Sequence, residues 1–409
     1  MKKICIIFSI LFFSGLIKAQ EEAIEVKKPL FVFSGYIIYE AYYDSYKSVT
    51  AREGNFYLFP LPEELDNNGN DINKQGQLNM LSAQSRFRAK INGPEAFGAK
   101  VNGLVEIDFL GTTLTSIQTP RIRHMFVNLT WERAQLLLGQ SWHPLFVTEC
   151  FPQVLGMGAA IPFNPLNRAP QVKYSYNVND EIEVSGAAIS YIDQNSTGPA
   201  NAQKNAILPD IHATVKYKTG DFITGIVSGF KTFKPRLVTE TGDITNQKTG
   251  SFDVAAFAKY KAGELTLKAY TIYGQNLTPY SMIGGYGAAN EVDDYSYSNI
   301  NTMAFWGEGM YDIHAFGLGM FVGYTANLSS SDSNYYELTG YTRGGDIDNL
   351  LRISPRITYT SGKVEFGFEY MMTRATYMTL DAANGKYEAI TTADAVSNNR
   401  LYFSAKYSF

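Results

Sequence analysis

The sequence has 409 residues, of which 18% are charged, and its formal net charge is −4. This nearly neutral charge, without a basic stripe, excludes a nucleic-acid-binding protein. The 28 Tyr and 26 Phe, without a long apolar run beyond the first residues, favour a membrane β-barrel over a helical membrane protein.

The first residues, "MKKICIIFSILFFSGLIKAQ", contain two lysines, an apolar run from Ile4 to Phe13 and small residues near Ala19. The apolar run is too short to span a bilayer, so the pattern predicts a cleaved signal peptide over residues 1–19. Because no linker or composition shift follows, residues 20–409 are predicted to form a single barrel domain. After cleavage Cys150 is the one remaining thiol, which excludes a disulfide framework.

Apolar and polar residues alternate along the whole chain and predict about sixteen strands. In chain order the predicted strands are 30–47, 78–92, 97–110, 120–132, 134–143, 168–178, 180–193, 208–218, 221–234, 248–261, 263–275, 297–311, 312–326, 347–361, 363–376 and 397–409. Short connections alternate with long ones, which are 48–77, 144–167, 276–296, 327–346 and 377–396. This alternation predicts an all-β protein, a transmembrane antiparallel β-barrel with short periplasmic turns and long extracellular loops. A barrel of this size leaves an aqueous channel, so a diffusion channel is the default function.

The alternation also assigns arginines to the inner face of the barrel. Arg86 and Arg88 lie on the second strand, Arg352 and Arg356 on the fourteenth, and Arg400 on the last. Because the last strand of a closed barrel pairs with the first, these strands share one stretch of wall. Arginine stays charged and can bind a carboxylate with two hydrogen bonds, so the pattern predicts a preference for small anions. The alternative is a weakly selective lumen in which nearby acids neutralise these arginines, namely Glu40, Asp44, Glu106, Asp108 and Glu365.

The opposite parity of the second strand is predicted to face lipid or a neighbouring subunit. Its members are Leu81, Ala83, Phe87, Ala89 and Ile91.

The connection 144–167 contains "VTECFPQVLGMGAAIPFNPLN", which is long and apolar. An exposed loop of this composition is unfavourable, and loops of this length are usually functional. We therefore expect it to fold into the barrel and to narrow the channel with Glu149, Phe151, Met157 and Phe163. The alternative is a loop that packs at a subunit interface.

Four segments carry a family resemblance: "FSGYIIYEAYYDSY", "SAQSRFRAKI", "VEIDFLG" and "RIRHMFVNLTWERAQLLLGQSWHPLF". They resemble the Gram-negative trimeric porin superfamily, and most of all the DcaP-like outer-membrane porins. The resemblance implies a homotrimer in the outer membrane of a Gram-negative bacterium. Each barrel would surround its own channel for small hydrophilic, often anionic, solutes. The terminal Phe409 resembles the residue that such barrels present to their assembly machinery.

The resemblance also places Arg121 and Arg123 near the constriction. Spacing alone does not, because both share their parity with Met125 and Val127. A bulge or a subunit interface is required before these two arginines can line the pore.

Other features do not predict chemistry. The four histidines, His124, His143, His212 and His314, do not lie at metal-ligand spacing from one another, so we predict neither a metal site nor a cofactor. The segment "DNNGNDINKQGQ" lacks the Gly and Glu that a calcium loop requires at its sixth and twelfth positions. Without a serine elbow or a compact His–Asp grouping in the sequence, we predict that the chain is not an enzyme. A solute-specific channel, a surface adhesin and an outer-membrane hydrolase remain the alternatives.

Overall fold

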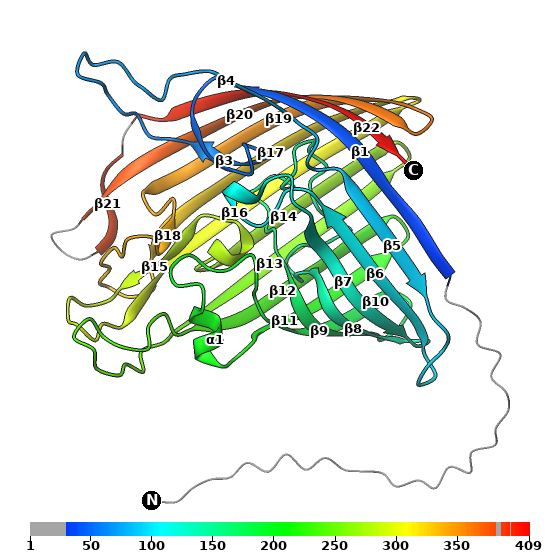
Figure 1. Cartoon of the computed structure of the whole chain (residues 1–409), viewed down its shortest axis with the longest axis horizontal. Helices are drawn as coiled ribbons and strands as arrows, with labels where there is room; N and C mark the ends of the chain where they lie inside the picture. Colours follow the sequence, from blue (N-terminus) through cyan, green and yellow to red (C-terminus); the bar gives the residue numbers. More distant parts are fainter. Residues whose placement is uncertain (1–29, 382–385, 393) are drawn as a thin grey trace, which may run out of the picture.

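The computed structural model describes residues 30–381, 386–392 and 394–409 (Figure 1). The predicted signal peptide therefore lies outside the described residues. Within these residues a 16-strand antiparallel sheet closes into a barrel, which confirms the predicted fold class. Its strands are β1 (Leu30–Asp44), β4 (Gln77–Leu81) with β5 (Arg86–Asn92), β6 (Lys100–Asp108), β7 (Arg121–Thr130), β8 (Ala134–Trp142), β9 (Arg168–Asn177), β10 (Ile182–Ile189), β11 (Asp210–Thr219), β12 (Phe222–Phe233), β13 (Thr249–Ala262), β14 (Leu265–Gln275), β16 (Tyr297–Ile313), β17 (Phe316–Ser330), β19 (Ile347–Ser361), β20 (Val364–Asp381) and β22 (Val396–Ser408).

The barrel closes where its first strand meets its last, as Figure 1 shows for β1 and β22. Their register runs from Tyr36 opposite Ser408 to Asp44 opposite Arg400. Beyond the strand, Phe409 exchanges two backbone hydrogen bonds with Gly35, at 3.1 and 3.2 Å. The chain end is thus held by the neighbouring strand.

The second wall strand is interrupted, which corrects one predicted orientation. A turn over residues 82–85 separates β4 from β5, with Ser85 N donating to Ser82 O at 3.2 Å. Ala83 lies in this turn and is buried in the interior core rather than facing outward. Phe87 follows the predicted parity and is exposed on the outer surface, against the ring of Phe409.

The outer surface of the wall is apolar. Along the long strands, large side chains such as Phe305, Leu318, Phe366 and Phe403 are exposed and alternate with buried polar residues. This alternation suits a lipid-facing outer surface and a polar interior. Among the described residues no helix is long and apolar enough to cross a bilayer.

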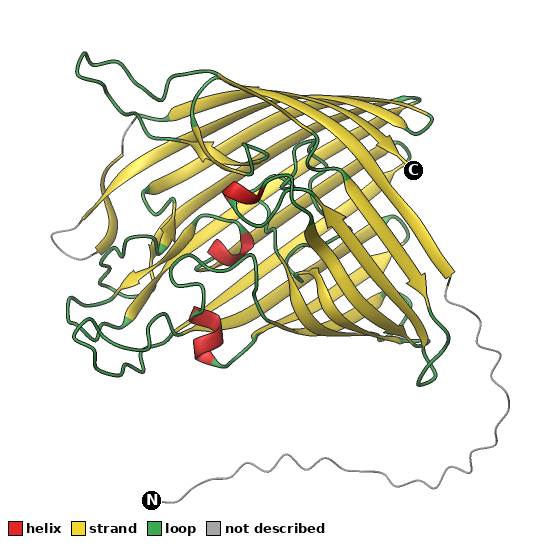
Figure 2. Ribbon diagram, in the orientation of Figure 1, coloured by secondary structure: helices red, strands yellow, loops and turns green. Residues whose placement is uncertain are grey.

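The hydrophobic core lies inside the barrel, because three connections fold into it. They are the loop 143–167, the hairpin of β2 (Ser48–Ala51) and β3 (Phe56–Pro60), and the segment 276–288 with η2 (Thr278–Tyr280) and β15 (Gly284–Ala288). Figure 2 shows these loops crossing the space enclosed by the strands. The remaining elements, η1 (Leu114–Ser116), α1 (Ala202–Ala206), β18 (Thr342–Arg343) and β21 (Lys386–Thr392), lie in other connections.

Candidate functional site

The loop 143–167 lies inside the barrel and is tied to several wall strands, which confirms the predicted inward fold over the interface alternative. Its backbone N–H groups donate to carboxylates of the wall, and wall side chains donate to its carbonyl groups. The contacts are Gln153 N to Glu308 Oε1 at 2.8 Å, Leu155 N to Glu369 Oε2 at 2.5 Å, Tyr270 OH to Leu145 O at 2.9 Å, Lys268 Nζ to Phe151 O at 2.9 Å and Arg352 Nη1 to Ile161 O at 2.7 Å.

The four loop residues predicted at the constriction occupy different positions. Phe163 and Met157 are buried in the core inside the barrel. Phe151 is partly buried and stacks on Phe146, with ring centroids 5.2 Å apart. Glu149 is bound to Lys216, with Oε1 2.6 Å from Nζ. The aromatic and apolar members thus fill space, and Glu149 attaches the loop to β11.

Cys150, at the base of the same loop, is fully buried. Its Sγ lies 3.3 Å from Ala258 O, and burial raises the pKa of the thiol to about 11. The thiol is therefore neutral and sheltered at physiological pH, which makes it unreactive.

A bulge brings Arg121 and Arg123 onto the inner face, as the parity required. The register between β6 and β7 passes from Glu106 opposite His124 to Ile107 opposite Ile122, so Arg123 is the extra residue. Arg121 binds Asp108 with two hydrogen bonds, at 3.0 and 2.7 Å. Arg123 bridges Glu106 and Asp108, at 2.7 and 3.0 Å.

Five arginines gather on the strands β5–β9, and we call this set the arginine wall. Its members are Arg86, Arg88, Arg121, Arg123 and Arg168. Glu106 and Asp108 are the carboxylates bound to it, and Arg88 also contacts Glu106.

Two members of the arginine wall lack an acidic partner. Among the described residues, neither Arg86 nor Arg168 has a carboxylate oxygen within 4.0 Å. Arg168 is 5% exposed, its guanidinium lies 4.8 Å from the centre of the Trp142 ring, and its Nη1 has no hydrogen-bond partner in the described part of the chain. Arg168 was not predicted, because it shares its parity with Val172 and Tyr174, which are exposed on the outer surface.

A cavity of about 430 Å³ lies between the arginine wall and the inward loop, and we call it the basic cavity. Five cationic side chains line it, against one carboxylate, that of Glu106; the cations are Arg86, Arg88, Arg123, Arg168 and Lys406. A second cavity, of about 370 Å³, reaches towards the short turns of the barrel. The two cavities share Tyr36, Gln84, Phe151, Val154, Leu155 and Lys406 in their linings, so they are neighbours.

The three remaining predicted arginines face inward as expected, but each is occupied by protein partners. Arg356 contacts Glu308, with Nη2 2.9 Å from Oε1. Arg400 binds Asp44 with two hydrogen bonds, at 2.8 and 2.7 Å. Together with Arg352 and Lys268 they form what we call the paired wall.

Arg352 attaches two inward segments to the wall. It donates to Ile161 O of the loop at 2.7 Å and to Leu58 O of the hairpin at 2.8 Å. Arg352 and Arg400 reach only a gap of about 20 Å³ between loop and hairpin, close to the size of one water molecule. These two arginines therefore hold the narrowing segments together and do not present free donors to a wide channel.

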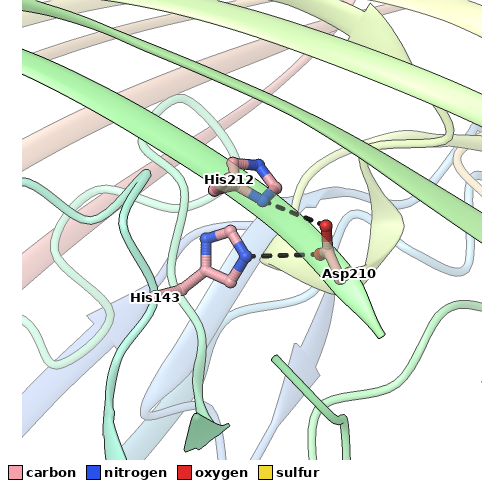
Figure 3. Close-up of side chains that lie close together, drawn as sticks. All are labelled: His143, Asp210 and His212. Carbon is pink, nitrogen blue, oxygen red and sulfur yellow. Dashed lines mark hydrogen bonds and ion pairs between the residues drawn. The ribbon is translucent and has the colours of Figure 1, made fainter. Parts of the chain in front are cut away.

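A second cluster of chemistry-bearing side chains lies where the loop after β8 meets β11, apart from the arginine wall. Figure 3 shows His143, Asp210 and His212 directed at one another. Asp210 Oδ2 lies 3.4 Å from His143 Nε2, and Asp210 Oδ1 lies 3.0 Å from His212 Nδ1. The sequence does not show a compact His–Asp grouping. The fold forms one by bringing His143, which follows β8, against Asp210 and His212 of β11. All three side chains are at most 1% exposed, so a substrate does not reach them.

Comparison with known proteins places this geometry in one fold. No family model and no curated protein matches the chain. The outer-membrane channel DcaP of Acinetobacter baumannii superposes with a TM-score of 0.69 at 18% identity, covering 93% of this chain and 98% of that one. The chain has the porin fold.

Two further solved structures have the same fold. An anion-selective porin from Comamonas acidovorans matches with a TM-score of 0.57 at 10% identity, covering 93% of this chain and 100% of the porin. The trimer form of OmpT from Vibrio cholerae matches with a TM-score of 0.54 at 12% identity, again covering 93% and 100%. At these identities the likeness establishes the fold, and the function must be argued from the interior side chains.

Proposed function

We propose that the chain is an outer-membrane porin that lets small hydrophilic solutes diffuse passively and favours anions such as small carboxylates. A sixteen-strand barrel is wide enough for an aqueous lumen. Its apolar outer surface suits a lipid environment, and its charged side chains lie inside.

The observation that carries the anion preference is the excess of cationic side chains around the basic cavity. A narrow space with low-dielectric walls concentrates the ions of opposite charge. Arg168 contributes most, because its guanidinium is buried and, within the described ranges, has an unpartnered Nη1 and lacks a carboxylate partner. An entering carboxylate supplies the acceptor that the protein does not provide.

We also propose a homotrimer. The strands of the arginine wall are short, and their outer surfaces expose apolar side chains such as Ile122, Met125 and Val127. A short wall with an apolar outer surface fits burial against a partner subunit. OmpT from Vibrio cholerae, which has the same fold, occurs in a trimer form.

A solute-specific channel is the second candidate. Trp142, Phe146 and Phe151 border the basic cavity beside its cations. Aromatic faces next to arginine can retain one class of solute, whereas general diffusion requires only a polar, hydrated channel lining. A conductance that saturates with one solute class, or is blocked by it, favours this candidate.

Reconstitution of the purified protein in a planar bilayer tests the proposal. We expect ohmic steps in groups of three, anion selectivity in a salt gradient and a small unitary conductance, because three segments narrow the lumen. Absence of conductance contradicts the porin function, and cation selectivity contradicts the role of the basic cavity.

A further inference from the structure

We propose that His143, Asp210 and His212 form a binding site for a first-row transition-metal ion, with Zn²⁺ as the best match. The site is independent of the proposed channel function. Imidazole nitrogens and a carboxylate oxygen are the donors that Zn²⁺ prefers. One ligand atom from each residue lies within 4.8 Å of the other two.

The donor distances fit a shared ion. Zn²⁺ bonds of about 2.0–2.1 Å place neighbouring ligand atoms roughly 3–3.5 Å apart in a tetrahedral site. His143 Nε2 lies 3.4 Å from Asp210 Oδ2 and His212 Nδ1 lies 3.0 Å from Asp210 Oδ1, so an ion of this size would lie against both oxygens of the Asp210 carboxylate. The two imidazole rings lie edge to face, with centroids 4.4 Å apart.

The contact between Asp210 and His212 is poorly explained as a hydrogen bond. Although Asp210 Oδ1 and His212 Nδ1 are 3.0 Å apart, both atoms lack a hydrogen-bond partner among the residues that the structure describes, which means that the N–H direction misses the oxygen. Two ligand atoms of one tetrahedral ion have this arrangement. Each directs its lone pair at the ion, so the other ligand atom lies roughly 40° away from that lone-pair direction. The misalignment therefore favours a metal ion over a shared proton.

The surroundings resemble the outer shell of a metal site. The other nitrogen of His212, Nε2, lies 2.8 Å from Asp253 Oδ1. A metal-bound histidine usually donates its second N–H to a carboxylate in this way, which fixes the ring and increases its basicity. Asp253 is itself held by Lys231 Nζ and by Tyr280 OH, both at 3.0 Å.

The local charges also accommodate a cation. Beside the site, the two carboxylates of Asp210 and Asp253 face the single ammonium group of Lys231. Binding through His143 Nε2 moves the proton of that ring to Nδ1, which removes one long hydrogen bond, 3.3 Å, from Leu145 N. Two metal–nitrogen bonds and one metal–oxygen bond outweigh that loss.

Metal binding can be measured on the tag-free, full-length protein. The protein is unfolded with EDTA present, freed of the chelator and refolded into detergent with Co²⁺ alone. We expect one Co²⁺ per chain, the visible absorption of four-coordinate Co²⁺, and loss of that absorption when Zn²⁺ is added. The variants His212→Gln and His143→Gln should abolish stoichiometric binding, and Asp253→Asn should weaken it by about 10–100-fold.

His314→Gln is the matched control, because His314 lies in the turn between β16 and β17. It should bind Co²⁺ like the parent protein. Circular dichroism establishes that each variant has refolded, and His143→Gln, in a loop, serves if His212→Gln fails to fold. Substoichiometric Co²⁺ in the folded parent protein, or full binding by a folded His212→Gln or His143→Gln variant, overturns the proposal.

Discussion

Within the part of the chain that the structure describes, Arg86 and Arg168 on the arginine wall lie without a carboxylate partner, whereas Arg356 and Arg400 on the paired wall each lie beside one. Both walls face the same lumen and use the same residue type. The arginines of the paired wall hold the structure together, since Arg352 and Arg400 donate to backbone carbonyls of the inward segments. The unpartnered arginines leave donors for a solute.

This difference separates arginines that stabilise the fold from arginines that are left unpaired at a cost in stability. An unpaired buried charge is unfavourable, so a fold usually provides it with a partner. A guanidinium that lines a cavity without such a partner therefore indicates a ligand-facing role. The position of arginines on the inner face is insufficient evidence of selectivity, because most of them are neutralised.

The largest expected effect comes from removing an acid of the paired wall. Asp44→Ala leaves Arg400, 2% exposed, without its carboxylate. We expect a loss of about 3–5 kcal/mol in the free energy of unfolding, since an uncompensated buried charge remains. Urea unfolding in detergent measures this loss.

Glu365→Ala is the control for that measurement. The ion pair of Glu365 with Lys406, at 2.5 Å, is about one third exposed. Its loss should cost no more than about 1 kcal/mol. Equal destabilisation by the two substitutions would contradict the structural role assigned to the paired wall.

A smaller effect is expected from Arg352→Met, which removes the link between loop and hairpin. We expect a higher and noisier unitary conductance, because the gap of about 20 Å³ widens. Arg374→Met, on the outer surface of β20, is the control and should conduct like the parent protein. A conductance unchanged by Arg352→Met would show that the gap is not the narrowest part of the channel.

The smallest effect concerns Cys150. Its pKa of about 11 and its burial predict that a maleimide does not label the folded protein at pH 7–8. Labelling should become complete only after unfolding, which mass spectrometry can follow. Rapid labelling of the folded protein would show that the loop leaves the lumen.

Much of the fold could be predicted, because alternation is a direct consequence of a wall with lipid on one side and water on the other. The bulge at Arg123 could also be anticipated, since the parity of Arg121 and Arg123 conflicted with Met125. The inward loop was predicted from its apolar composition. The hairpin 48–60 carries the same signal in "FYLFPL" but was treated as an ordinary loop.

The site was less predictable, because partners come from distant parts of the chain. Spacing cannot show that Asp44 lies opposite Arg400, a pairing that depends on barrel closure. Arg168 shares its parity with the exposed Val172 and Tyr174, yet it is buried and lines the basic cavity, which spacing does not predict. His143 and His212 meet because the segment after β8 folds back against β11.

The zero-current potential across a planar bilayer in a salt gradient tests the role of Arg168 most directly. One charge at roughly 8 Å and an effective dielectric constant near 40 changes the energy of an anion and of a cation by about 1 kcal/mol each, in opposite directions. Arg168→Gln should therefore lower the anion-to-cation permeability ratio about thirtyfold. Arg374→Gln should leave the ratio unchanged. A parent channel that selects cations, or an Arg168→Gln channel with the parent ratio, would contradict the assignment of the basic cavity as the selectivity site.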